Sequence, residues 1–189
     1  SPMPIHPANT LGFMITSVFM NPNVFAGCMG IGVLLSLGLA VSTEKKAARA
    51  VHLVCLSINS LAFMLAFSMG ACVMIVPAFL VFLAFESRER RASLLLLMLE
   101  TLTVTLLATF PISLTSMTAW DGVRPIPLLC TIGAAAALCV LDLFVGRRAA
   151  ARLSEHRKAV LCLVGAVLAA VVVFAVVACN WTTGVSLQA

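Results

Sequence analysis

Eleven of the twelve lysine and arginine residues of this chain lie in three short clusters, and long apolar stretches separate the clusters. The clusters are Lys45, Lys46 and Arg49; Arg88, Arg90 and Arg91; and Arg147, Arg148, Arg152, Arg157 and Lys158. Basic residues next to membrane-spanning segments stay on the cytoplasmic side. Three clusters on one side require an even number of crossings between each pair, and we take all eleven residues as determinants of membrane topology.

The composition excludes an ordinary soluble domain. The chain of 189 residues is 62% hydrophobic and only 10% charged, whereas soluble domains have about 45–50% apolar and about 25% charged residues. With so few charges the chain cannot cover itself with a polar surface, so we expect the lipid bilayer to surround most of it. The net charge of +5 follows from the basic clusters, and we expect no nucleic-acid partner.

The apolar stretches predict an all-α fold, a polytopic membrane helix bundle that forms a single domain over residues 1–189. About six transmembrane helices are expected, at 24–41, 51–67, 70–85, 93–116, 128–145 and 159–179, with both termini outside. Segment 11–20 is too short to cross about 30 Å of hydrocarbon at 1.5 Å per residue. We interpret it as an interfacial helix or as the first part of a helix kinked at 21–23.

The apolar stretch at 51–85 decides how the first two basic clusters relate. As one helix it would be about 52 Å long and would place those clusters on opposite sides of the membrane. Two short helices that turn near Ser68 keep both clusters inside, so we expect a hairpin. Small residues in the first span, Gly27, Gly30, Gly32 and Gly38, predict a close contact between helices, and so does the run at 133–137 in the fifth span.

Glu100 is the side chain most able to carry chemistry. It lies seven residues inside the predicted fourth span, with Thr103 near it on the same helix face. An ionised carboxylate at such a depth is costly, so it is usually paired, protonated or hydrated. The functional interpretation is a proton or cation relay, or a contact with the polar headgroup of a cofactor. The structural alternative is a protonated glutamic acid in a hydrogen bond between helices.

Two further polar residues are candidates for an ion or quinone pathway. Asp142 lies four residues before Gly146 and near Arg147, which predicts an ion pair at the inner interface. His52 stands at the inner end of the second span. Ligation of haem by two histidines needs a second intramembrane histidine, which the predicted spans lack, so we do not expect such a haem.

Motifs for self-contained catalysis are missing from the sequence. It contains no C-x-x-C pair, no H-E-x-x-H and no glycine loop for phosphate. We therefore expect no catalytic residues, no metal site and no enzymatic activity of the chain on its own.

Two stretches resemble a known family of membrane subunits. The order of His6, residues 12–19 (GFMITSVF) and residues 26–27 resembles the start of the membrane-anchor subunit of dimethyl sulfoxide reductase-type enzymes. Residues 118–120 and 125–127, leading into a Gly/Ala-rich span, look like a later part of that subunit. The resemblance covers residues 6–145, and it implies quinol binding and electron delivery to an iron–sulfur subunit that feeds a molybdenum subunit. The family usually has eight helices, and it carries a histidine where this chain has residues 67–70 (FSMG).

Three roles fit these observations. We favour a non-catalytic integral membrane subunit or anchor of a larger redox complex in a bacterial inner membrane, with other protein subunits as partners. The cofactor is left open, and a quinone is one candidate. The first alternative is a small six-helix transporter or channel that uses Glu100. The second is a structural or assembly protein in which Glu100 only holds helices together.

Overall fold

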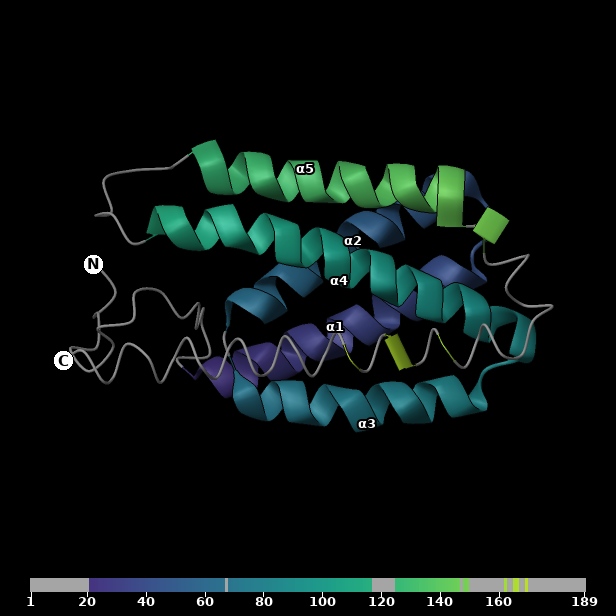
Figure 1. Cartoon of the computed structure of the whole chain (residues 1–189). Helices are drawn as coiled ribbons and strands as arrows, with labels where there is room; N and C mark the ends of the chain where they lie inside the picture. Colours follow the sequence, from purple (N-terminus) through teal and green to yellow (C-terminus); the bar gives the residue numbers. More distant parts are fainter. Residues whose placement is uncertain are drawn as a thin grey trace.

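The computed structural model describes residues 21–66, 68–116, 125–146 and 148–149, together with residues 162, 165, 166 and 169. Over these residues the fold is all-helical, and its elements are α1 (Pro22–Ser42), α2 (Lys46–Leu65), α3 (Met69–Phe85), α4 (Arg88–Ser116), α5 (Pro125–Leu141) and the π-helical turn η2 (Asp142–Gly146) (Figure 1). The predicted all-α fold is confirmed for this part of the chain. Segment 11–20, residues 117–124 and most of the predicted span at 159–179 lie outside the described residues.

The first helix begins where its capping residues predict. The side chain of Asn21 accepts a hydrogen bond of 2.9 Å from the backbone N–H of Asn23. Pro22 occupies the first helical position, where its missing N–H costs nothing. At the other end the Thr43 hydroxyl donates to the carbonyl of Leu39 over 2.6 Å. A helix therefore covers the predicted span at 24–41, with one or two further residues at each end.

The stretch at 51–85 forms two helices with a turn at Ser68, as the expected hairpin requires. The Ser68 hydroxyl accepts from the N–H of Ala71 at 3.2 Å and donates to Oδ1 of Asn23 at 2.6 Å, which ties the turn to the start of α1. Helix α3 packs against α1, and it runs antiparallel to α2 (Figure 1).

Two helices begin earlier than predicted. Helix α2 begins at Lys46 and helix α4 at Arg88, where the sequence had suggested starts at residues 51 and 93. Lysine and arginine are good helix formers, and their long side chains reach from a helix terminus into the polar layer. The first two basic clusters therefore lie mostly on the first turns of helices rather than in loops.

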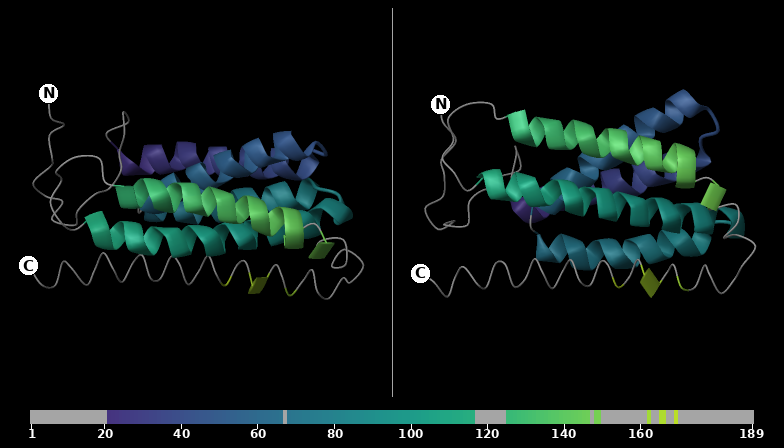
Figure 2. Two further views of the ribbon diagram at one scale, coloured as in Figure 1. Left: turned by 90° about the horizontal axis from the view of Figure 1, so that it is seen from above. Right: turned by 45° about the horizontal axis from the view of Figure 1, so that its top comes forward.

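All the basic segments that the structure describes lie at one end of the bundle. The α1–α2 turn, the α3–α4 turn and η2 are at the right of Figure 1, and the two views in Figure 2 agree. Arg148 follows η2 by two residues. We call this end the basic end.

Within the described residues, four helices are long and apolar enough to cross a membrane, which indicates an integral membrane protein. The candidate spans are Asn23–Ser42, Lys46–Leu65, Arg90–Thr109 and Ile126–Phe144, and Gly70–Phe85 is a shorter apolar helix. These match five of the six predicted spans in position.

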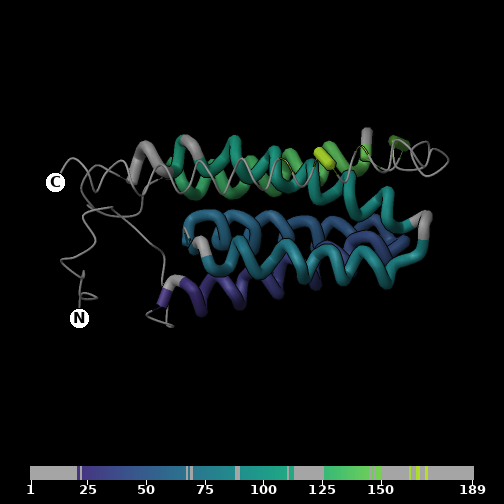
Figure 3. Tube along the Cα trace, turned by 60° about the horizontal axis from the view of Figure 1, so that its bottom comes forward, coloured from purple at the N-terminus to yellow at the C-terminus, as the bar shows by residue number. Residues whose placement is uncertain are grey.

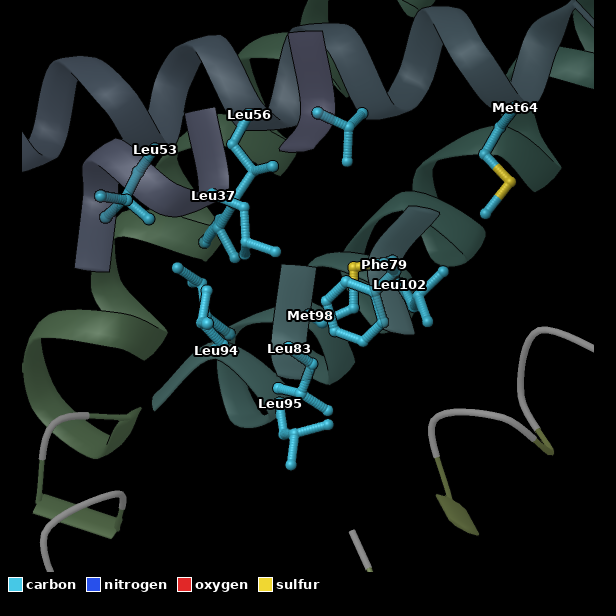
Figure 4. Close-up of a cluster of buried hydrophobic side chains, with 14 residues drawn as sticks. Leu37, Leu53, Leu56, Met64, Phe79, Leu83, Leu94, Leu95, Met98 and Leu102 are labelled. Atoms are coloured by element: carbon cyan, nitrogen blue, oxygen red, sulfur yellow. The ribbon is translucent and has the colours of Figure 1, made fainter. Parts of the chain in front are cut away.

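The helices lie side by side along a common direction (Figure 3). Helix α1 packs most extensively on α2, and α2 also packs on α4 and α5, which contact each other. A large apolar core joins all five helices; its most buried members include Leu37, Leu53, Leu56, Leu94 and Leu138. Figure 4 shows most of this cluster.

Glycines of α1 allow the close helix contacts that the sequence predicts. A Cβ on Gly32 would lie 2.9 Å from Cγ of Asn59 in α2, and a Cβ on Gly38 would lie 2.9 Å from Cζ of Phe82 in α3. Among the described residues, nothing lies within 4 Å of the place that a Cβ of Gly27 would take, so the predicted contact is not seen at this residue.

The helix contact expected from residues 133–137 involves fewer of these residues than predicted. Ala134 is buried with Leu61 of α2 and Val104 of α4. Gly133 and Ala136 are exposed on the outer side of α5. Only part of the small-residue run therefore contacts the described helices.

Candidate functional site

A buried ion pair joins α2 to η2 at the basic end. Arg49, in the first turn of α2, donates from Nε to Oδ2 of Asp142 at 2.6 Å and from Nη2 to Oδ1 at 2.5 Å. Its third nitrogen, Nη1, donates to the backbone carbonyl of Ala40 in α1 at 2.7 Å. The two side chains are only 5% and 3% exposed. One guanidinium group therefore holds three helical elements together.

The geometry of the Arg49–Asp142 pair offsets part of the free-energy cost of burying two charges. Two parallel N–H···O bonds match the planar fork of arginine to both carboxylate oxygens. A buried pair offsets the loss of hydration only when its geometry is good and the remaining donors are satisfied. In Arg49 the carbonyl of Ala40 accepts a third hydrogen bond beside the two to Asp142, so the pair has good geometry and one additional hydrogen bond.

Glu100 of α4 brings a second carboxyl group to the same place. If Gly146 carried a Cβ, that atom would lie 2.8 Å from Oε1 and 3.2 Å from Oε2 of Glu100, and 3.3 Å from Oδ1 of Asp142. The two carboxyl groups therefore face one point beside the Gly146 backbone. We call Arg49, Asp142 and Glu100 the charge cluster.

The two carboxyl groups differ in their partners. Both oxygens of Asp142 accept hydrogen bonds from Arg49. Oε2 of Glu100 is buried and has no hydrogen-bond partner within the described part of the chain. A buried polar atom without a partner is uncommon in native proteins and calls for an explanation. The cluster also holds two acidic groups against one cation.

The local backbone makes this approach of two carboxyl groups feasible. Asp142 is the first residue and Gly146 the last residue of η2. π-Helical turns are rare and occur mostly as single turns, frequently at functional sites. Because glycine has no side chain, the Glu100 carboxyl can lie against the backbone of the turn. Residues with larger side chains at 146 would occupy that space.

The structure brings two of the four sequence candidates together and leaves two apart. Glu100 and Asp142 share the charge cluster. Thr103 is exposed, and its hydroxyl donates to the carbonyl of Leu99 in its own helix at 2.8 Å. His52 is half-buried one turn further along α2, and no hydrogen bond or ion pair among the described residues joins it to the cluster.

Asp142 has a partner that the sequence did not indicate. The sequence suggested an arginine of the following basic segment, most of which lies outside the described residues, and the described partner of Asp142 is Arg49, 93 residues away. Arg148 is exposed, and the side chain of Arg147 lies outside the described residues. Arg49, which the sequence groups with the surface charges of the first basic cluster, is 4% exposed.

Glu100 lies well along α4, which agrees with the sequence expectation for its place in the fourth span. Helix α4 begins at Arg88, and Glu100 is near the middle of the candidate span Arg90–Thr109. Its carboxyl lies beside the backbone of Gly146, the last residue of η2.

Sequence reasoning missed the roles of Arg49 and Gly146. One signal could have indicated Arg49: it falls in phase with the buried residues Leu53, Leu56 and Ser60 of α2, at the spacing of a single helix face. No comparable signal marks Gly146, because its role depends on a side chain of another helix.

Further polar atoms lie deeper in α2. The hydroxyl oxygens of Ser57 and Ser60 are buried and have no partner in the described part of the chain. Ser60 lies on the same face of α2 as Arg49, about 16 Å further along the helix. The buried Thr101 and Thr109 hydroxyls instead donate to carbonyls of their own helix.

Within the described residues, no group of three or more His, Cys, Asp or Glu side chains could hold a metal ion. No family model, no curated protein and no solved structure matches this chain. The resemblance to the membrane anchor of dimethyl sulfoxide reductase-type enzymes therefore stays a prediction.

Proposed function

We propose that this chain is a small membrane transporter or channel in which Glu100 takes up and releases a proton. The observation that carries the proposal is the buried Oε2 of Glu100, which has no described hydrogen-bond partner although a fully engaged Arg49–Asp142 pair lies beside it. If Glu100 served only to join helices, we would expect both of its carboxyl oxygens to form hydrogen bonds with neighbouring helices. Ionisable groups inside membrane segments commonly mark proton or ion pathways.

The charge cluster can accommodate both the charged and the protonated state of Glu100. When Glu100 loses its proton, the guanidinium of Arg49 partly offsets the new negative charge. When Glu100 regains the proton, the Arg49–Asp142 pair remains neutral and hydrogen-bonded by itself. Both states of the carboxyl can therefore exist without rebuilding the bundle.

The proposed topology has six spans with both termini outside, in a bacterial inner membrane. It is supported by the common position of the α1–α2 and α3–α4 turns at the basic end (Figure 1) and by the rule that basic segments stay in the cytoplasm. In this orientation the charge cluster lies near the cytoplasmic face, and protons would enter or leave it from that side.

Reconstitution into liposomes tests the proposal. The purified chain is placed in vesicles that contain a pH-sensitive dye, and a potassium diffusion potential drives proton entry. We expect Glu100→Gln to lower the proton flux by about a hundredfold, the lower end of what a positioned proton-transfer group contributes. Glu44→Gln is the matched control, because Glu44 is exposed in the α1–α2 turn and its variant is expected to conduct like the wild type.

The structural alternative makes the opposite prediction for the same variants. If Glu100 only joins helices, Glu100→Gln keeps a hydrogen-bonding group and leaves flux and stability unchanged, whereas Glu100→Leu destabilises the bundle. Wild-type flux no higher than that of empty vesicles would contradict the transport proposal directly.

A second candidate role is the non-catalytic membrane subunit of a redox complex, with a quinone and other protein subunits as its partners. One observation favours it: Gly133, Ala136 and Ala137 are exposed on the outer side of α5, and small residues let another helix approach closely. Purification in a mild detergent tests this role. Co-elution of a redox protein is the expected result, and a chain that always elutes alone counts against it.

A further inference from the structure

A groove of about 250 Å³ lies between α1, α3 and the first turns of α4, toward the basic end. Its walls are mainly apolar and include Leu34, Leu35, Leu39, Phe82 and Leu94. Gly38 also lines it, and the ring of Phe82 lies against this glycine, with Cζ 2.9 Å from the place that a Cβ would take. Two polar residues also line the groove: Ser42, which is the last residue of α1, and Glu86, which directly follows α3.

We call the end of the groove beside Ser42 and Glu86 its mouth. The negative groups at the mouth already accept hydrogen bonds from arginine side chains. Oε1 of Glu86 lies 3.2 Å from Nη1 of Arg90. Arg91 donates from Nε to the carbonyl of Glu86 at 2.8 Å and from Nη2 to the carbonyl of Ala84 at 2.9 Å. The end of α3 is therefore capped by a cation, which offsets the partial negative charge of its last carbonyls.

Positive charge remains in excess around the mouth. Residues 43–50 and 86–91 contain six basic and three acidic residues. One of the basic residues, Arg49, is neutralised by Asp142. Lys45 and Lys46 are exposed and follow Ser42 of the groove by three and four residues.

We propose that the groove is a binding site for an anionic phospholipid of the leaflet next to the basic end. One acyl chain lies along the leucine walls, and the phosphate lies near Lys45, Lys46 and Arg91. Basic segments beside membrane helices attract anionic lipids, and basic pockets between helices on the cytoplasmic side bind lipid head groups. The proposal does not depend on proton transfer by Glu100.

Lipid retention tests the site on the full-length chain. The protein is incubated in mild detergent with equal amounts of phosphatidylglycerol and phosphatidylcholine and is then repurified, and the bound lipids are quantified by mass spectrometry. The wild type is expected to retain phosphatidylglycerol in preference to phosphatidylcholine. Removing two cations by Lys45→Gln with Lys46→Gln is expected to lower that preference about tenfold, whereas Arg148→Gln is expected to leave it unchanged.

A filling variant tests the groove independently of charge. Leu35→Trp places an indole in the groove, and Ile31→Trp is its control, one turn earlier on the same side of α1; the two residues are 62% and 61% exposed. We expect Leu35→Trp to lose most of the bound phosphatidylglycerol and Ile31→Trp to keep it. Equal retention of both lipids by the wild type, or equal retention by both tryptophan variants, would overturn the proposal.

Discussion

Replacing Arg49 by methionine should lower the free energy of unfolding of the bundle by about 3–5 kcal/mol, because it leaves Asp142 buried without its partner. The pair is 5% and 3% exposed, so water cannot easily replace the lost donors. The carbonyl of Ala40 loses its Arg49 donor in the same step. The measurement is a titration of the purified chain from mild detergent micelles with sodium dodecyl sulfate, followed by the loss of helical signal.

The double variant distinguishes a lost charge partner from lost packing. Arg49→Met combined with Asp142→Leu removes both charges and keeps apolar bulk, so most of the lost stability should return. Arg90→Met is the surface control, because Arg90 is paired with Glu86 but 55% exposed, and we expect a change below about 1 kcal/mol. If the double variant is as unstable as the sum of the two single variants, the pair does not act as a unit.

Adding a methyl group at Gly146 should disturb the charge cluster without removing any charge. In Gly146→Ala the new Cβ would lie 2.8 Å from Oε1 of Glu100, which is closer than van der Waals contact allows. The Glu100 carboxyl must therefore move away from residue 146. We expect a loss of about 1–3 kcal/mol in stability, reduced somewhat by the higher helix propensity of alanine, together with a lower proton flux in liposomes.

Gly133→Ala is the matched control for this substitution. Gly133 lies in α5, and no described residue comes within 4 Å of the position that its Cβ would take. This variant should be neutral or slightly stabilising. Truncating the clashing side chain by Glu100→Ala in the Gly146→Ala background should restore stability but not flux. Identical behaviour of Gly146→Ala and Gly133→Ala would show that Glu100 does not lie against the turn.

The five described helices could be predicted from the sequence because two strong signals agree. The length of each apolar stretch limits how many crossings it can make, and the basic clusters decide which stretches must turn back. The turn at Ser68 follows from both signals. The boundaries at Lys46 and Arg88 were less accurate, because a charged helical turn and a charged loop have similar compositions.

The charge cluster could be predicted only in part. Glu100 and Asp142 stand out because carboxylates are rare in apolar segments. Their meeting depends on the packing of α4 against α5 and η2, and the Arg49–Asp142 contact spans 93 residues. The local sequence pattern around Asp142 contains no information about a partner so far away in the sequence. The rule that basic residues face the cytoplasm also gave no reason to separate Arg49 from Lys45 and Lys46.

The most direct test concerns the basic end itself, since the topology and the position of the charge cluster both depend on it. Single cysteines are introduced as Glu44→Cys, Ser87→Cys and Gly70→Cys in a chain whose seven cysteines are replaced by serine, and intact cells or oriented vesicles are labelled with a membrane-impermeant maleimide. We predict that positions 44 and 87 react from the same compartment and position 70 from the opposite one. Reaction of positions 44 and 87 from opposite compartments would contradict the proposed topology.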